Sequence, residues 1–152
     1  MEAQDQSAIE AMFVSYQAAW AANDPQRLEA HWDSTDAAPV YLAEEIATRM
    51  TDWDAIRGYW KNNREYIERV RLTFSDFVFK PLHEDLVTAV FDMRWDIRFR
   101  SADTPPMGGD NRVVATVRRQ GKHWRLIAWV EAPLAALPYL QQLYARNAAS
   151  DL

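Results

Sequence analysis

The sequence lacks cysteine and contains little glycine or histidine. Its 152 residues include no Cys, four Gly and three His. The absence of cysteine excludes disulfides, thiolate nucleophiles and zinc or iron–sulfur sites built on cysteine. The histidines, His31, His83 and His123, stand singly and without metal-ligand spacing. We therefore expect no metal site, and any chemistry is predicted to proceed without a cofactor.

Basic residues are also few compared with acidic ones. Seventeen Lys and Arg against 22 Asp and Glu give a net charge of -5, which disfavours nucleic acid and anionic membranes as partners. The first twenty residues carry acids where a signal peptide carries basic residues, and they contain no unbroken apolar run. We expect a cytoplasmic protein that forms one domain over residues 1–152.

Three helices are predicted in the first half of the chain. Apolar residues recur at helical spacing from Ile9 to Trp20, after a capping box that begins at Ser7. Asp24 and Pro25 are suited to begin a second helix, which runs to about Trp32. A third helix is predicted from the Thr51–Asp54 capping spacing to about Arg69.

The second half of the chain has the period of strands. A short extended segment, 39–42, precedes the third helix, and strands follow from Val70, over 89–100, and in a hairpin of 113–118 and 124–130. In the strand from Val70, Val78 is predicted to share a face with Leu72, and Phe77 to lie on the opposite face. A C-terminal helix is predicted from Leu134 to Tyr144.

This segregated order of elements predicts an α+β fold. Three N-terminal helices would pack on a curved, mostly antiparallel sheet of four to six strands, followed by the C-terminal helix. Such a sheet encloses a cone, and a cone is a natural place for a small ligand.

Three strings in this order resemble the NTF2-like superfamily and, within it, the SnoaL-like domains. They are Ala22-Asn23-Asp24, Trp53-Asp54-Ala55-Ile56, and the final strand 124–129. The resemblance covers the chain from Ile9 to about Leu137. It implies a cone-shaped (cystatin-like) barrel, a homodimer packed through the sheet, and a pocket between the sheet and the long helix. It implies no single function, because the superfamily includes isomerases, dehydratases, epoxide hydrolases, cyclases and non-catalytic transport or association domains.

The first candidate for chemistry is a set of three charged residues: Arg94, Asp96 and Glu131. Arg94 and Asp96 lie two apart in a strand and so share a face, and Glu131 follows the last strand. The set is similar to the Asp-Arg-Asp arrangement of limonene epoxide hydrolases. That resemblance implies that one carboxylate acts as general base on water and the other as general acid, with Arg94 holding their pKa values apart. The Tyr-x-Asn segment of those enzymes is not matched, since Tyr41 is followed by Leu42 and Ala43.

Each of these residues also has a structural interpretation. Residues 92–100 alternate in charge on one face, which suits a solvated or dimer-facing charge ladder. Tyr41 with Glu44 and Glu45 is similar to the oxyanion and base pair of ketosteroid isomerase, or these are exposed loop acids. His31 could shuttle protons or simply pack at a helix end.

The ligand side of the prediction depends on aromatic residues. Seven Trp, six Tyr and six Phe make up 12% of the chain, and SnoaL-like sequences often carry His where this chain has Ala128 and Val130. The expected pocket is therefore apolar. It would bind a small apolar or aromatic molecule through Trp20, Trp32, Tyr41, Trp60, Trp95 and Trp129. Hydrolase, dehydratase or isomerase chemistry is one hypothesis; a non-catalytic ligand-binding domain or a dimeric assembly domain with a filled cone is the alternative.

Overall fold

The computed structural model describes residues 1–134, 141–142 and 145–146. Three helices come first among these residues: α1 (Ala3–Ala21), α2 (Pro25–Glu29) and, after strand β1 (Val40–Leu42), α3 (Trp53–Tyr66). Strands β2 (Ile67–His83), β3 (Leu86–Phe99), β4 (Met107–Gln120) and β5 (His123–Pro133) follow. Most of the predicted C-terminal helix lies outside the described residues.

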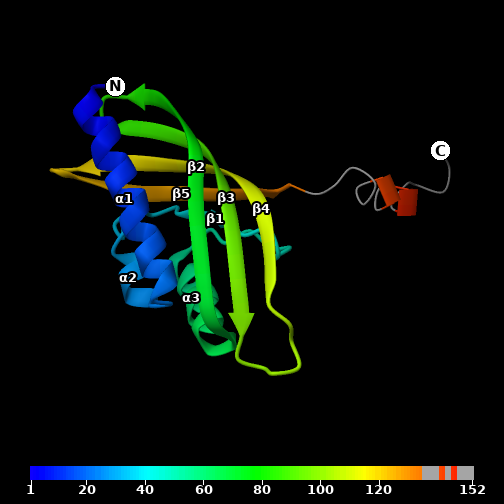
Figure 1. The fold of residues 1–152 in the computed structure, drawn as a ribbon. Coiled ribbons are helices and arrows are strands. Elements are labelled where there is room, and N and C mark those ends of the chain that lie inside the picture. Colours follow the sequence, from blue (N-terminus) through cyan, green and yellow to red (C-terminus); the bar gives the residue numbers. More distant parts are fainter. Residues whose placement is uncertain (135–140, 143–144, 147–152) are drawn as a thin grey trace.

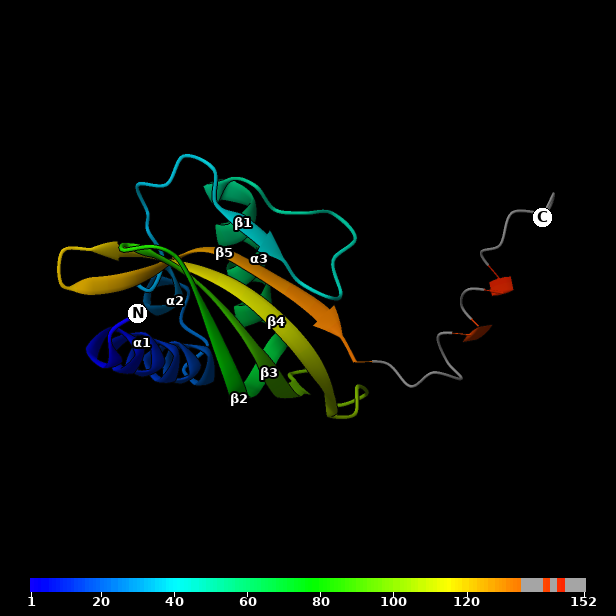
Figure 2. The same cartoon turned by 90° about the horizontal axis from the view of Figure 1, so that it is seen from above.

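The strands form one sheet in the order β1-β5-β4-β3-β2. All neighbouring pairs are antiparallel except β1 and β5, which are parallel. The sheet is strongly curved: α1 lies along it at one end, and it curls around α3 at the other (Figures 1 and 2). This arrangement confirms the predicted α+β fold with helices packed on a curved sheet.

The helix boundaries follow from their caps. The Asp24 side chain accepts hydrogen bonds from the N–H groups of Gln26 and Arg27 at 3.0 and 3.4 Å, which confirms it as the cap of α2. Asp52, not Thr51, caps α3, because its carboxylate accepts from the N–H of Ala55 at 2.8 Å. Helix α1 begins at Ala3, before the predicted capping box, and buries the predicted apolar stripe: Ile9, Met12, Phe13, Tyr16 and Trp20.

The predicted faces of β2 are wrong beyond Ser75. The register against β3 shifts between Ser75 and Val78, and Asp76 adopts a left-handed conformation with φ 57°. This bulge adds a residue to one strand and reverses the alternation after it. Phe77 therefore packs on the core, its ring 4.7 Å from that of Phe91, while Val78 is 65% exposed.

Strand β3 alternates as the sequence predicts. Its odd-numbered residues, Ala89, Phe91 and Met93, are buried on the face that the helices cover. The even-numbered residues point to the outer face of the sheet. In the described part of the chain, no helix is both long and apolar enough to span a membrane.

Candidate functional site

A cavity of about 430 Å³ lies inside the curved sheet, bounded by residues of β2, β3 and β5, of α3, and of the loop after β1. Its volume falls in the range of small-molecule sites. The wall is mainly apolar and aromatic, and its polar groups gather at one end: Tyr41, Glu44, Glu45, Tyr59, Asn63 and Glu131. A second hollow, of about 740 Å³, lies on the surface beside the β2–β3 turn.

Four of the six aromatic residues predicted to bind ligand line this cavity: Trp20, Tyr41, Trp95 and Trp129. Trp32 and Trp60 do not. Trp60 is fully buried and Trp32 is 2% exposed, and their rings pack against each other 6.0 Å apart. The structure therefore places these two behind the wall, where they support it as core residues.

Glu131 is held at the polar end by three hydrogen bonds. Its Oε1 accepts from Nε1 of Trp129 at 2.7 Å, and its Oε2 accepts from the N–H of Glu44 at 3.2 Å and from Nδ2 of Asn111 at 3.3 Å. Burial raises the pKa of the Glu131 carboxyl to about 7, although the bonds from Trp129 and Glu44 act to lower it. The charges of Glu45 and Glu44 add to the rise. Near neutral pH this carboxyl is thus able both to take up and to release a proton.

Glu44 and Glu45 lie in the loop after β1, beside Glu131. Burial, with a contribution from the charge of Glu45, raises the pKa of Glu44. Glu45 accepts a hydrogen bond of 2.8 Å from the hydroxyl of Tyr59. Burial, followed by the negative charge of Glu45, raises the pKa of Tyr59 well above its usual value. Tyr59 therefore stays neutral and acts as a hydrogen-bond donor.

Tyr41 also lines the cavity, and its ring packs against the aromatic rings of Tyr59 and Trp129. It is 1% exposed, and its ring stacks on that of Trp129 at 6.3 Å. Burial also raises the pKa of Tyr41 well above its usual value. The cavity end thus combines carboxyl groups of raised pKa with neutral phenols, an arrangement suited to moving a proton on a bound molecule.

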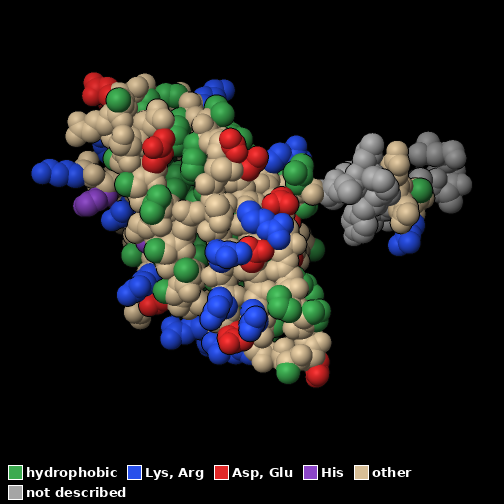
Figure 3. Space-filling model, in the orientation of Figure 1, with side chains coloured by type: hydrophobic (Ala, Val, Ile, Leu, Met, Phe, Trp, Pro, Cys, Tyr) green, Lys and Arg blue, Asp and Glu red, His purple; other side chains and the backbone are tan. Residues whose placement is uncertain are grey.

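The structure does not bring Arg94 and Asp96 together with Glu131. Both lie on the outer face of the sheet, because they alternate with Trp95, whose indole faces the cavity. There Asp96 pairs with Arg94 at 3.0 Å and with Arg71 at 2.8 Å. Arg94 also reaches Asp110 at 3.3 Å. Figure 3 shows acidic and basic side chains intermingled over β2, β3 and β4. This arrangement agrees with the structural interpretation of the segment as a charge ladder.

Two consecutive glycines on β4, Gly108 and Gly109, leave room for side chains of β3 on the two faces of the sheet. Gly109 pairs with Trp95 across β3 and β4, and a Cβ there would lie 2.7 Å from Cζ2 of the Trp95 indole. At Gly108, a Cβ would lie 2.5 Å from the Arg94 guanidinium on the opposite face. The absence of a side chain at Gly109 therefore lets the indole lie flat on β4 and form part of the cavity wall.

The histidines lie away from the cavity. His31 joins the end of α2 to α1: its Nδ1 is 2.7 Å from the carbonyl of Arg27, and its Nε2 is 2.8 Å from the hydroxyl of Ser15. This is the packing role, not a proton shuttle into the cavity. His123 begins β5 and is exposed.

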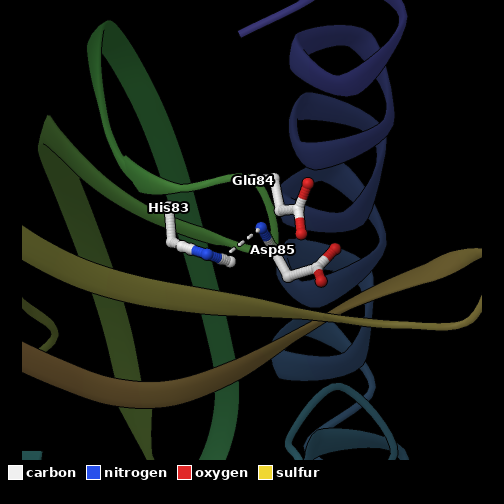
Figure 4. A group of neighbouring side chains, drawn as sticks. All are labelled: His83, Glu84 and Asp85. Carbon is white, nitrogen blue, oxygen red and sulfur yellow. Dashed lines mark hydrogen bonds between the residues drawn. The ribbon is translucent and has the colours of Figure 1, made fainter.

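His83 lies in the exposed β2–β3 turn with Glu84 and Asp85, and the potential metal-ligand atoms of the three lie within 4.8 Å of one another (Figure 4). His83 and Asp85 are already engaged in contacts of the turn. The N–H of Asp85 donates to Nδ1 of His83 at 3.5 Å, and the Asp85 carboxylate pairs with Arg119 at 3.0 Å. We assign these residues a structural role.

Sequence reasoning missed three cavity residues on α3 and, on β4, a residue that holds Glu131. Tyr59, Asn63 and Tyr66 line the cavity from one side of the helix, and their spacing of four and three residues is a signal that was available. Asn111, 2% exposed, gave no such signal, because its contact with Glu131 depends on the pairing of β4 with β5.

Known structures share this fold. A candidate aromatic ring hydroxylase from Novosphingobium aromaticivorans is 16% identical, with a TM-score of 0.78 over 90% of this chain and 93% of that one. A candidate scytalone dehydratase from the same organism is 16% identical, with a TM-score of 0.76 over 86% and 85%. A candidate dehydratase of the NTF2-like family from Streptomyces avermitilis is 11% identical, with a TM-score of 0.75 over 88% and 98%.

These identities establish the fold alone. No protein of curated function is a significant match to this chain. The family model of the SnoaL-like domain matches residues 9–135, which is most of the sequence. The chain therefore belongs to the SnoaL-like domain family.

Proposed function

We propose that this protein binds a small apolar or aromatic molecule in the cavity and transfers a proton on it through Glu131. The observation that carries the proposal is a carboxyl group held by Trp129, Asn111 and the Glu44 N–H at the polar end of an apolar cavity. The reaction would need no cofactor, because a base and neutral hydroxyl donors are both supplied by the chain.

Elimination or isomerisation fits this geometry better than epoxide hydrolysis. The latter reaction, as the resemblance implied it, needs the Arg94–Asp96 pair beside Glu131, and that pair lies on the other face of the sheet. Among the acids of the cavity, Glu131 is the one that three hydrogen bonds hold in place, and we assign it as the base. It would remove a proton from a carbon of the substrate, while the hydroxyl of Tyr41 or Tyr59 donates a hydrogen bond to the oxygen that gains negative charge. Two of the similar structures are described as candidate dehydratases, whose reaction is an elimination.

The test is a pair of variants assayed on a panel of cyclic ketones and hydroxyketones. Glu131→Gln keeps the shape of the side chain and removes the base, so we expect turnover to fall by about a hundredfold or more. Asp96→Asn is the matched control on the outer face and should leave turnover within about twofold. Loss of activity in the control with full activity in Glu131→Gln would overturn the proposal.

A ligand-binding role without catalysis is the second candidate. The apolar wall favours it, because a cavity of this size accommodates a small molecule whether or not a reaction follows. Binding of panel compounds without turnover in the unmodified protein would select this candidate. A domain that serves assembly alone, with a filled cone, is disfavoured by the cavity.

We also propose that the protein forms a homodimer through the outer face of the sheet. Val90 pairs with both Val78 and Val114 across the sheet, and the three are 41–65% exposed. Adjacent exposed valines on β2, β3 and β4 form an apolar stripe of the kind that a partner covers.

A further inference from the structure

Within the part of the chain that the structure describes, the acidic residues of the cavity have no basic partner. Glu44, Glu45 and Glu131 line one end of it, and the described wall includes no Lys or Arg. None of the three takes part in a salt bridge within the described residues, although nine such bridges form elsewhere. Carboxylates gathered in a partly buried site without a cation are costly, and either a proton or a cationic ligand relieves that cost.

The carboxylate of Glu131 is held in a fixed position at this end. Asn111, 2% exposed and outside the cavity wall, donates from Nδ2 to Oε2 of Glu131. Trp129 donates to the other oxygen, Oε1. A ligand therefore meets a carboxylate whose orientation the protein already sets.

The rest of the wall is aromatic, with Trp20, Tyr41, Trp95 and Trp129 around the acids. The faces of such rings attract cations, most strongly where water is excluded. Neutral apolar ligands would gain from the rings but would leave the carboxylates unpaired.

We propose that the ligand of this cavity is a protonated amine with an apolar or aromatic body. The ammonium group lies against Glu131 and its two neighbouring acids, and the body fills the space between the rings. This inference rests on the proposed function, in that the cavity is the ligand site, and it names the chemical class of the ligand.

The test compares two molecules of nearly equal shape by calorimetry and tryptophan fluorescence. N,N-dimethylbenzylamine is protonated at neutral pH, and isobutylbenzene is its uncharged carbon analogue. At pH 8 we expect the amine to bind the protein at least about tenfold more tightly. Its affinity should rise as the pH is raised from about 6 to 8 and the Glu131 carboxyl, whose pKa is about 7, ionises, while Tyr41 and Tyr59 stay neutral.

Variants separate the charge from the shape of the cavity. Glu131→Gln, and independently Glu45→Gln, should weaken binding of the amine by about tenfold and leave isobutylbenzene within about twofold. Asp92→Asn, which removes an exposed carboxylate from the outer face of the sheet, should change neither. Equal or tighter binding of isobutylbenzene would overturn the inference and leave the proposed function standing. Binding of neither molecule would count against the cavity as a ligand site, and so against both.

Discussion

Trp129 donates a hydrogen bond of 2.7 Å to Glu131, two residues further along the same face of β5. One indole thus serves both the aromatic wall and the acid, because Trp129 is fully buried and also lines the cavity. The bond favours the ionised carboxylate and acts against the effect of burial on the Glu131 pKa.

Removing this donor should raise the pKa of Glu131. A hydrogen bond to a charged group contributes about 1.5 to 3 kcal/mol, so Trp129→Phe should raise this pKa by about one to two units. Carbon-detected NMR titration of the carboxyl group measures the change. Trp60→Phe is the control, since Trp60 is equally buried but has no contact with Glu131. An unchanged pKa in Trp129→Phe would show that the bond has no effect on ionisation.

Glu131 should also make stability depend on pH. Its pKa is about 7 in the folded protein and about 4.3 in an unfolded chain. Between these values the folded state binds more protons, so stability falls as pH rises through this window. Glu131→Gln has no proton to lose and serves as the reference. Since the Glu131 side chain is partly exposed, we expect the free energy of unfolding of the unmodified protein to fall by about 2 kcal/mol relative to this variant between about pH 4.5 and 8.

Urea unfolding of the two proteins across this range measures the effect. The difference in unfolding free energy between them should change steadily with pH, and Asp92→Asn should follow the unmodified protein. Parallel curves for the unmodified protein and Glu131→Gln would contradict the raised pKa.

A methyl group at Gly109 should disturb the cavity wall. Gly109→Ala places a Cβ against the Trp95 ring, in a contact too short to persist, so the indole must move into the cavity. We expect a loss of stability of about 1 to 3 kcal/mol and weaker ligand binding. Gly58→Ala is the control: nothing lies within 4 Å of its Cβ, in the middle of α3, and alanine favours a helix by up to about 1 kcal/mol. Thermal unfolding of both variants measures the change in stability. Equal stability of Gly109→Ala and the unmodified protein would contradict the close contact.

The alternation of side chains along β3 explains how much of the site the sequence could predict. Trp95 and its two neighbours Arg94 and Asp96 were all expected at the ligand, but alternate residues of a strand face opposite sides. Trp95 shares a face with Met93 and Phe91, which are buried in the core. Arg94 and Asp96 therefore face outward. Glu131 was predicted because the resemblance to limonene epoxide hydrolases places a second acid at the end of the last strand, and the structure shows it in the cavity wall with Trp129.

Other features depend on contacts that a strand pattern does not record. The bulge at Asp76 reversed the faces of Phe77 and Val78 without a glycine or proline to mark it. Asn111 reaches Glu131 only through the pairing of β4 with β5. Local spacing therefore predicted the elements and one acid of the site, whereas its partners were set by the packing of the sheet.

The valine stripe on the outer face should determine the oligomeric state. Val114→Glu places a charge within the proposed dimer interface, where it would be buried without a partner. We expect light scattering to show a dimer for the unmodified protein and a monomer for the variant at the same concentration. Val14→Glu is the control, because Val14 is 65% exposed on α1, away from the sheet face, and this variant should remain a dimer. A monomer in the unmodified protein, or a dimer that survives Val114→Glu, would contradict an interface through these strands.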